Sequence, residues 1–520
     1  MIFSSPEFLF LFLPATLIGT ILARRNSPFH ALLWLGLASA FFYAWWHPPS
    51  LLLLLASIAF NFVFGERIRR ATTERAASRQ LAFAVSANLL ALAYFKYSGF
   101  LVSATSYAMG LTLRFHPPEL PLGISFFTFT QIAYLVDTRR TRTTSTDFAS
   151  YWLFVTYFPH LIAGPVLHHA QFMPQFKRRR AFTITSTSLA VGISLLAIGL
   201  AKKTLLADPL GIYASAVFDD AATGARPLLV ESWIGALCYS FQLYFDFSGY
   251  SDMALGISRT INLRLPANFL SPYKATSIID FWRRWHVSLS SFLRNYLYIP
   301  LGGNRKGRWR TKLNMFVTML LGGMWHGAGW TYILWGGFHG ALLVFNHAWR
   351  NLVGQTDNRK GRPTLGLRLC GGLLTFLLVM IGWVLFRSAD ITTAARVLGG
   401  LVGLNGISLP PSAAAYIPST LDQVVRPAYE GAFAGSATLR NMGINRLLVI
   451  LPVASVIVWV MPNTAELFRR RAAITPAPLV VRTRSGRWRP ALVISLLLGG
   501  LLAMAILAIN SRSEFLYFQF

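Results

Sequence analysis

The chain has 520 residues, of which 54% are hydrophobic and only 13% are charged, and its mean hydropathy is +0.49. Soluble domains carry about 25% charged residues, so this composition excludes an ordinary soluble protein and indicates an integral membrane protein. The formal net charge of +29 would suggest nucleic-acid binding in a soluble chain. Here the basic residues stand in short loops between apolar runs, which argues against a nucleic-acid partner.

Several apolar runs are long enough to cross a hydrocarbon core of roughly 30 Å. They begin near Phe8, Ala31, Leu51, Leu81, Ser188, Leu229, Leu369, Leu447 and Ala491. With the shorter runs between them, the sequence predicts about 10–13 membrane-embedded helices in an all-α polytopic protein. None of the polar connections is long enough to build a core of its own, so residues 1–520 form a single integral membrane domain.

The basic loops predict the orientation of these helices. Arg24 and Arg25 follow the first run, and the arginine-rich residues 66–79 follow the third, so both loops are expected in the cytoplasm. This places the N-terminus outside. Basic residues at 469–471 and 482–489 place the C-terminus outside as well, which predicts an even number of crossings. Residues 405–445 then form an extracytoplasmic connection.

Two carboxylates, Asp246 and Asp252, lie in the aromatic-rich stretch 244–252. Buried acids are costly unless they are paired, so we expect ion pairs with Arg259, Arg283 or Arg284. This structural role is favoured over acid-base chemistry. No cysteine or carboxylate set accompanies His160, His168 and His169, so no metal site is predicted; Cys238 and Cys370 are interpreted as packing residues.

Residues 277–297 carry apolar side chains at alternating spacings of three and four, which predicts one amphipathic helix along an interface. His286 falls at the edge of its apolar stripe. Residues 274–312 hold nine Lys or Arg residues against one acid. The functional interpretation is a cytoplasmic mouth that binds an anionic donor, with Lys274, Arg283, Arg284 and Arg294 as its contacts. Ordinary loop topology with anionic membrane lipids explains the same pattern.

The most informative stretch is 319–327, in which His326 stands inside a glycine-punctuated apolar run. An ionisable side chain at membrane depth is a functional-site hypothesis. Basic loops flank residues 314–349 on both sides, and the arm 314–321 would be only about 12 Å long as a helix. We therefore expect a re-entrant or broken hairpin, with His326 at the break beside a cavity.

Six motifs together resemble the membrane-bound O-acyltransferases, and more narrowly their bacterial AlgI-type branch that O-acetylates exopolysaccharides. They are residues 121–129, 158–165, 244–252, 282–286, 300–304 and 321–327, followed by 462–464 and the tail 514–518. The resemblance implies a helical ring around a central funnel in the bacterial inner membrane. It divides the domain into N-terminal spans (1–120), a core (121–387) and a C-terminal extension (388–520).

By this resemblance His326 matches the essential active-site histidine and His286 the second motif histidine. The implied reaction passes an acetyl group from cytoplasmic acetyl-CoA, with no bound cofactor, to a hydroxyl on a periplasmic partner protein or on the polymer, alginate or cellulose. Neutral His326 would act as general base, while His286 would orient the thioester or stabilise the oxyanion. D-alanyl transfer to a cell-wall polymer, a membrane transporter and a structural scaffold are the alternatives.

Overall fold

The computed structural model describes residues 1–111, 115–141, 147–162, 164–353, 364–407, 435–442, 445–468, 492–509 and 516. Regular structure in these ranges is helical, which confirms the all-α prediction. The predicted basic loops 469–471 and 482–489, and most of the predicted extracytoplasmic connection 405–445, lie outside the described residues.

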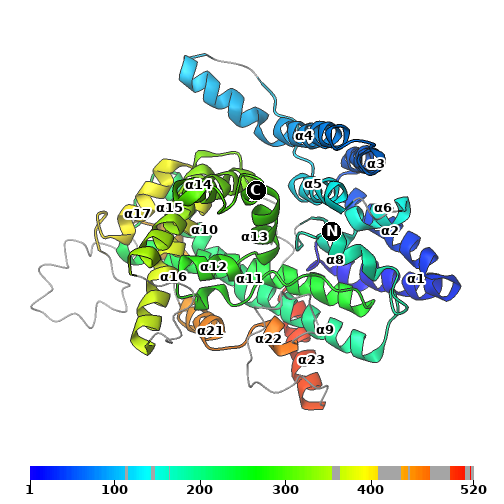
Figure 1. The fold of residues 1–520 in the computed structure, drawn as a ribbon. Helices are drawn as coiled ribbons and strands as arrows, with labels where there is room; N and C mark the ends of the chain where they lie inside the picture. Colours follow the sequence, from blue (N-terminus) through cyan, green and yellow to red (C-terminus); the bar gives the residue numbers. More distant parts are fainter. Residues whose placement is uncertain are drawn as a thin grey trace, which may run out of the picture.

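The helices of the first half of the chain form the blue-to-green part of Figure 1. They are η1 (Phe8–Phe12), α1 (Leu13–Asn26), α2 (Pro28–Ala44), α3 (Pro48–Arg70), α4 (Glu74–Met109), α5 (Ile124–Thr141), α6 (Phe148–Thr156), α7 (Phe158–Leu161), α8 (His169–Phe172), η2 (Met173–Gln175), α9 (Ser186–Ala201), η3 (Lys202–Ala207), α10 (Asp208–Ala222) and α11 (Leu229–Thr260).

The second half contributes the green, yellow and red elements of the same view. They are η4 (Pro272–Lys274), α12 (Ile278–Arg284), α13 (Val287–Leu293), η5 (Arg294–Tyr298), α14 (Gly307–His326), α15 (Trp330–Leu352), α16 (Leu365–Arg387), α17 (Ile391–Leu401), α20 (Ala437–Met442), α21 (Leu447–Trp459), α22 (Thr464–Phe468) and α23 (Leu492–Leu507).

Arginines mark one end of the N-terminal helices. The last turns of α1, α3 and α5 each carry at least two arginines, whereas no basic residue stands in the last turn of α2 or α4. Cations near a helix C-terminus also complement the helix dipole. Successive helices thus alternate in direction, with their basic ends on one side, as the positive-inside rule requires of a multi-pass protein.

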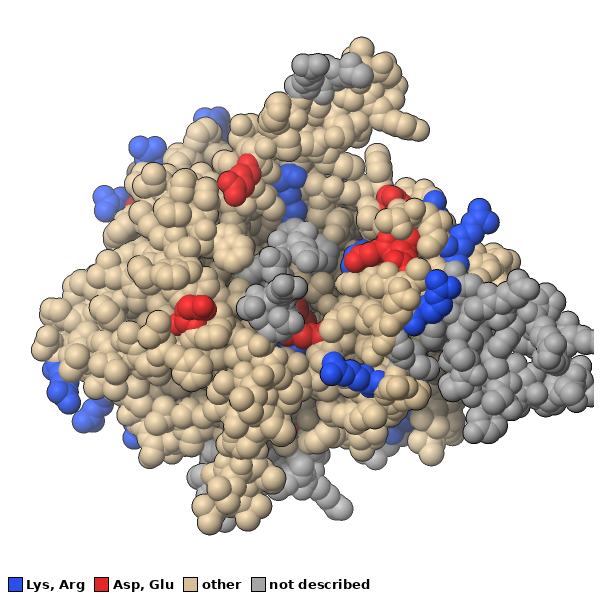
Figure 2. Space-filling model, turned by 180° about the vertical axis from the view of Figure 1, so that it is seen from behind, with Lys and Arg blue, Asp and Glu red and all other residues tan. Residues whose placement is uncertain are grey.

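Five helical segments of the described chain are long and apolar enough to cross a membrane: Phe8–Asn26, Pro48–Arg70, Glu74–Met109, Ser186–Ala222 and Leu365–Arg387. Four shorter apolar helices accompany them. Most of the face in Figure 2 carries neither acidic nor basic side chains. The protein is therefore a multi-pass membrane protein, while the total of 10–13 embedded helices stays a prediction.

Helix α11 is the centre of the fold: it crosses the middle of Figure 1, and every residue from Leu243 to Thr260 is buried. It packs tightly against α9 because glycines face each other across the contact. A Cβ on Gly199 would lie 2.6 Å from the carbonyl oxygen of Gly249. The two helices thus approach at backbone distance at this crossing.

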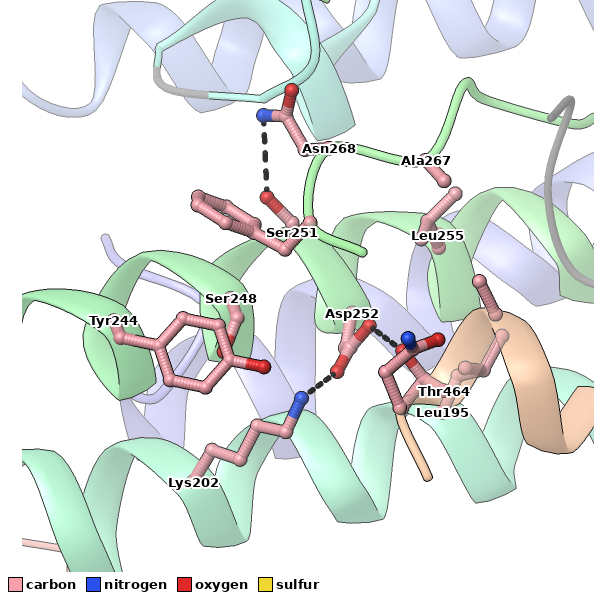
Figure 3. A pocket seen from close by; sticks show the side chains of 13 residues that line it. Leu195, Lys202, Tyr244, Ser248, Ser251, Asp252, Leu255, Ala267, Asn268 and Thr464 are labelled. Atoms are coloured by element: carbon pink, nitrogen blue, oxygen red, sulfur yellow. Dashed lines mark hydrogen bonds and ion pairs between the residues drawn. The ribbon is translucent and has the colours of Figure 1, made fainter. Parts of the chain in front are cut away.

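Asp246 and Asp252 of α11 are both ion-paired, but with lysines rather than with the predicted arginines. Lys202 Nζ lies 2.6 Å from Asp252 Oδ2, and Lys203 Nζ lies 2.8 Å from Asp246 Oδ1. Thr464 Oγ1 donates to Asp252 Oδ1 at 2.7 Å (Figure 3). Arg259 instead donates to Asn262, and Arg284 pairs with Asp280. Sequence spacing did not identify these lysines. They lie on η3, and only the packing of α9 against α11 brings η3 next to the two aspartates.

Cys370 also departs from expectation. Cys238 is buried on α11, as expected of a packing residue, but Cys370 on α16 is exposed. A small apolar thiol is tolerated on a helix surface in a membrane protein, because lipid chains rather than water cover such a surface.

Candidate active site

His326 is the last residue of α14, and Gly327 to Gly329 turn the chain into α15. Because α14 begins at Gly307, it is 20 residues and about 30 Å long, so the predicted short arm is wrong. The helix includes Arg308, Arg310 and Lys312, which the sequence analysis assigned to a loop. The hairpin therefore consists of two long helices, with the histidine at the turn between them.

The end of α14 is capped by α4. Lys96 Nζ donates to the carbonyl oxygens of Trp325 at 2.6 Å and of His326 at 3.0 Å, and Tyr97 Oη donates to that of Met324 at 2.5 Å. The last carbonyls of a helix have no partner within the helix, so these bonds satisfy groups that would otherwise be buried and unpaired. They also hold His326 against the N-terminal helices.

Two glycines set the closeness of the hairpin. A Cβ on Gly336 of α15 would lie 2.6 Å from the carbonyl oxygen of Met319 and 3.0 Å from Cα of Gly323. A Cβ on Gly323 would in turn collide with the backbone of Tyr332 and Gly336. Glycine at both positions lets α14 and α15 touch through their backbones, which fixes the height of His326 relative to α15.

The imidazole of His326 is 6% exposed and packs among aromatic rings. The ring centroids of Trp325, Trp335 and Phe386 lie 4.8, 5.1 and 5.2 Å from that of His326. The indole N–H groups of Trp325 and Trp335, both buried, have no hydrogen-bond partner among the described residues. Buried unsatisfied donors next to a histidine are groups that a substrate oxygen can use.

His326 lies on the wall of a cavity of about 150 Å³, as expected from the sequence. The lining comes from the end of α2, the middle of α4, the start of α5 and the end of α14: Trp46, Lys96, Leu120, Pro121, Leu122, Gly123, Ile124, Ser125, Phe126, Ile162, Trp325 and His326. Trp325 also lines a larger, mostly apolar pocket of about 520 Å³ between α4, α5, η5 and the hairpin. One side chain therefore separates the two.

His286 is fully buried, not at the edge of a wet surface. The predicted single helix is broken: α12 ends at Arg284, Trp285 is extended, and His286 has a left-handed backbone with φ of 43° before α13 begins. Backbone bonds explain the break. Leu270 N donates to Arg284 O at 3.0 Å and Val287 N donates to Asn268 O at 3.0 Å, so the segment 268–270 pairs with the broken turn.

Asn268 fixes the tautomer of His286. Its Oδ1 accepts from the backbone N–H of Ser288 at 3.3 Å and from Ser288 Oγ at 2.7 Å, which identifies this atom as the oxygen. His286 Nδ1 lies 3.2 Å from the same oxygen and must therefore carry the proton. Nε2 of neutral His286 is then a hydrogen-bond acceptor, and it cannot donate to an oxyanion.

His326 is within electrostatic range of His286, Lys96 and His339. The structure thus brings both motif histidines together and adds residues that the sequence analysis missed. The sequence does contain a signal for Lys96, because it is a lone charged residue in an apolar run. Asn268 and His339 had none. His339 is completely buried against Trp282 and Trp335, and neither ring nitrogen has a hydrogen-bond partner among the described residues.

The four predicted donor-binding residues are spread over η4, α12 and η5. Arg283 and Arg294 are exposed. Lys274 donates to the carbonyl oxygen of Met461 at 2.6 Å, and Arg284 pairs with Asp280 at 2.9 Å. A donor-binding role for the four thus stays a prediction, with Arg283 and Arg294 the two whose charges face outward.

His160 and His169 each have a partner within the protein. His160 Nε2 lies 2.8 Å from the carbonyl oxygen of Phe154, and His169 Nδ1 lies 3.3 Å from Asp137 Oδ2. Across the described ranges, no group of three or more His, Cys, Asp or Glu side chains is arranged to hold a metal ion. The chemistry open to the site is proton transfer by imidazole and hydrogen bonding by indole and ammonium groups.

Comparison with known proteins assigns the family. The sequence model of the MBOAT, membrane-bound O-acyltransferase family, matches residues 41–366. The chain is 41% identical over 438 residues to a peptidoglycan O-acetyltransferase of Helicobacter pylori, covering 79% of this chain and 81% of that protein. It is 44% identical over 406 residues to the probable alginate O-acetylase AlgI of Pseudomonas aeruginosa, covering 76% and 74%.

A more distant relative is a teichoic acid D-alanyltransferase of Streptococcus thermophilus, 28% identical over 282 residues, which cover 51% of this chain and 68% of that protein. The family match covers the part of the chain that contains Lys96, Asn268, His286 and His326. The chain therefore belongs to the membrane-bound O-acyltransferase family, and it is a multi-pass membrane acyltransferase.

Proposed function

We propose that the protein transfers an acetyl group from cytoplasmic acetyl-CoA to a hydroxyl acceptor on the opposite side of the membrane, for O-acetylation of an extracytoplasmic polysaccharide. The observation that carries this proposal is the position of His326. Its helix starts at the basic residues near Gly307 and ends at a cavity lined by the ends of α2 and α5 that carry no basic loop. The site thus lies between a strongly basic end of the helices and an end without basic loops.

The orientation follows from charge. With the basic loops in the bacterial cytoplasm, the N-terminus, Trp46 and residues 120–125 lie on the periplasmic side of the inner membrane. An anionic donor then approaches from the side of Arg283 and Arg294, and the acceptor enters through the cavity next to His326. A periplasmic modifying protein or the polymer itself presents the hydroxyl.

The reaction requires one base and one oxyanion site. Nε2 or Nδ1 of neutral His326 takes the hydroxyl proton while the oxygen attacks the thioester carbonyl carbon. The indole N–H groups of Trp325 and Trp335, whose rings pack against His326, are unpartnered donors that suit the resulting oxyanion. Collapse breaks the C–S bond, and the thiolate takes the proton back from His326. His286 accepts a hydrogen bond and so orients the donor.

The names of the relatives support two polymers. Peptidoglycan and alginate both appear among proteins more than 40% identical to this chain. D-alanyl transfer is less favoured, because that relative is 28% identical over half of this chain. Acetylation of cellulose stays a prediction from the sequence.

The test is acetyl transfer by the purified full-length protein with radiolabelled acetyl-CoA and His326→Ala. We expect the transfer rate to fall by at least about 100-fold, because a general base contributes that much. His160→Ala is the matched control, since His160 is equally buried but bonds only locally. Full activity of His326→Ala at normal protein levels contradicts the proposal. Solute flux through proteoliposomes without acetyl-CoA would instead identify a transporter.

A further inference from the structure

Lys96 is the only charged residue of α4 beyond Arg79. Its ammonium lies near the turn that follows His326, and no carboxylate of the described residues pairs with it. Placing a lysine within an apolar membrane helix is costly, because lipid chains cannot solvate an ammonium. A charge kept at that cost, without a counter-ion among the described residues, requires a reason.

Capping of α14 does not require the charge. Tyr97, the next residue, caps the carbonyl oxygen of Met324 with a neutral hydroxyl. A neutral donor at position 96 could serve the next two carbonyls in the same way. An ammonium has three N–H groups, and the two carbonyl bonds of 2.6 and 3.0 Å use two of them. Ser125 Oγ, at 3.5 Å, is at the limit of a hydrogen bond for the third.

The cavity that contains His326 gives this third N–H a use. Lys96 is the only Lys, Arg, Asp or Glu in its lining, which also includes Ser125 and Trp46. Among the described residues, the lining therefore carries a positive charge and no acidic side chain. A carboxylate that enters the cavity would complete the ion pair, and charge-assisted hydrogen bonds of this kind are the strong ones.

We propose that Lys96 binds a carboxylate of the acyl acceptor and so orients the acceptor hydroxyl toward His326. This assignment rests on the proposed function and specifies its acceptor: a hydroxyl compound that carries a carboxylate, not a neutral sugar. Two sources offer this chemistry, an acidic sugar of the polymer and an acidic end of a partner protein. In both, the ammonium pairs with the carboxylate while the hydroxyl reacts at the imidazole.

The experiment measures binding to the purified full-length protein with two pairs of probes. One pair is a trimer of a uronic acid and its methyl ester; the other is a short serine-containing peptide with a free C-terminal carboxylate and its C-terminal amide. We expect at least one acidic probe to bind about tenfold more tightly than its neutral partner, the ratio for one charged hydrogen bond. The probe that does so identifies the source.

Lys96→Gln keeps a hydrogen-bond donor without the charge and should bring each pair to within about twofold, whereas Lys96→Arg should retain the preference. Tyr97→Phe, which removes a cap but no charge, should retain it too. If Lys96→Gln does not fold, the wild-type preference and its decline with added salt decide the matter. Equal binding of acidic and neutral probes to the wild type, or a preference that survives in Lys96→Gln, overturns the assignment.

Acetyl transfer is scored separately in the same preparation. Transfer from acetyl-CoA without any carboxylate preference overturns the role of Lys96 and leaves the proposed function standing. A carboxylate preference that Lys96→Gln abolishes, without any acetyl transfer, supports the binding role and contradicts acetyl-CoA as the donor.

Discussion

At the scale of single residues, one amide oxygen determines what His286 can do. Asn268 Oδ1 accepts from Ser288 and from the Nδ1–H of His286, so the ring is held with Nε2 as an acceptor. The ring of Phe247 packs edge-to-face against the imidazole of His286, with a centroid distance of 4.8 Å, and also restricts the orientation of the imidazole. An imidazole held in this way offers Nε2 as a hydrogen-bond acceptor, which supports the proposed role of His286 in orienting the acyl donor.

Replacement of Asn268 tests this role. Asn268→Ala should lower kcat/KM for acetyl-CoA by about 10- to 100-fold, by analogy with the loss of hydrogen-bond partners of metal-binding histidines. Asn268→Asp should restore part of the loss, because a carboxylate oxygen also accepts from Nδ1–H. Ser251→Ala removes only the 3.5 Å contact on the other side of Asn268 and serves as control. Equal losses in all three variants would show that Asn268 acts on folding alone.

The family motifs identified both histidines in the sequence, but they did not identify the residues that hold these histidines in place. Lys96 is 229 residues from Trp325, and Asn268 is 18 residues from His286 across a break in helical structure. Such pairs leave no periodic pattern. They become visible only when the packing of distant helices is known.

At the scale of elements, the α14–α15 hairpin depends on the two glycines at its crossing. Gly323 and Gly336 place the backbones in contact, and His326 lies three residues beyond Gly323. Small residues at helix crossings are the usual means of close association in membranes. The position of the histidine is therefore set by a contact one turn away from it.

Alanine at one of these glycines should separate the helices. Gly336→Ala should cost about 1–3 kcal/mol by overpacking and lower acetyl transfer, since the Cβ would meet Met319 O at 2.6 Å. Gly337→Ala is the matched control, because its Cβ would lie 3.7 Å from Leu320, an ordinary contact. Thermal unfolding in detergent and transfer assays measure both effects. Equal behaviour of the two variants would refute the role of the crossing.

The broken amphipathic helix shows where periodicity fails. Apolar spacing of three and four continues from α12 into α13, because both present an apolar face to the same core. The pattern does not show the break at Trp285 and His286, because the break depends on the hydrogen bonds of the flanking residues Arg284 and Val287 to segment 268–270. Local sequence predicted helices there correctly, and tertiary hydrogen bonds decided where they stop.

At the scale of the whole molecule, buried ion pairs connect segments from three parts of the chain. Asp252 of α11 holds Lys202 of η3 and Thr464 of α22, and Asp246 holds Lys203 and the backbone N–H of Leu516. The central helix thus fastens the C-terminal extension to the core. Resemblance predicted that the extension belongs to the same domain, but the lysine partners required the structure.

Asp252→Asn should reveal the strength of this connection. Loss of one partner leaves Lys202, whose side chain is 14% exposed, without its anion, so we expect destabilisation of about 3 kcal/mol or more. The double variant Lys202→Met, Asp252→Leu should recover most of this loss, because no charge is left unpaired. Unfolding in mixed detergent micelles measures both. If the double variant is as unstable as Asp252→Asn, the two side chains stabilise the protein through their packing and not through their charges.

The orientation of the molecule is tested by labelling single cysteines in a Cys370→Ser background, which removes the exposed native thiol. An impermeant maleimide should label Trp46→Cys in intact cells and Arg308→Cys only after the membrane is opened. The reverse pattern would place the acceptor cavity on the cytoplasmic side.

The cap that Lys96 provides has a consequence for synthesis. Its carbonyl partners lie 229 and 230 residues further along the chain, so at about 5–20 residues per second the ribosome delivers them about 10–50 s after the lysine. During that interval α4 carries an ammonium that α14 cannot yet meet. The apolar remainder of α4 must therefore keep the nascent helix in the bilayer by itself. The site around His326 can be completed only late in translation.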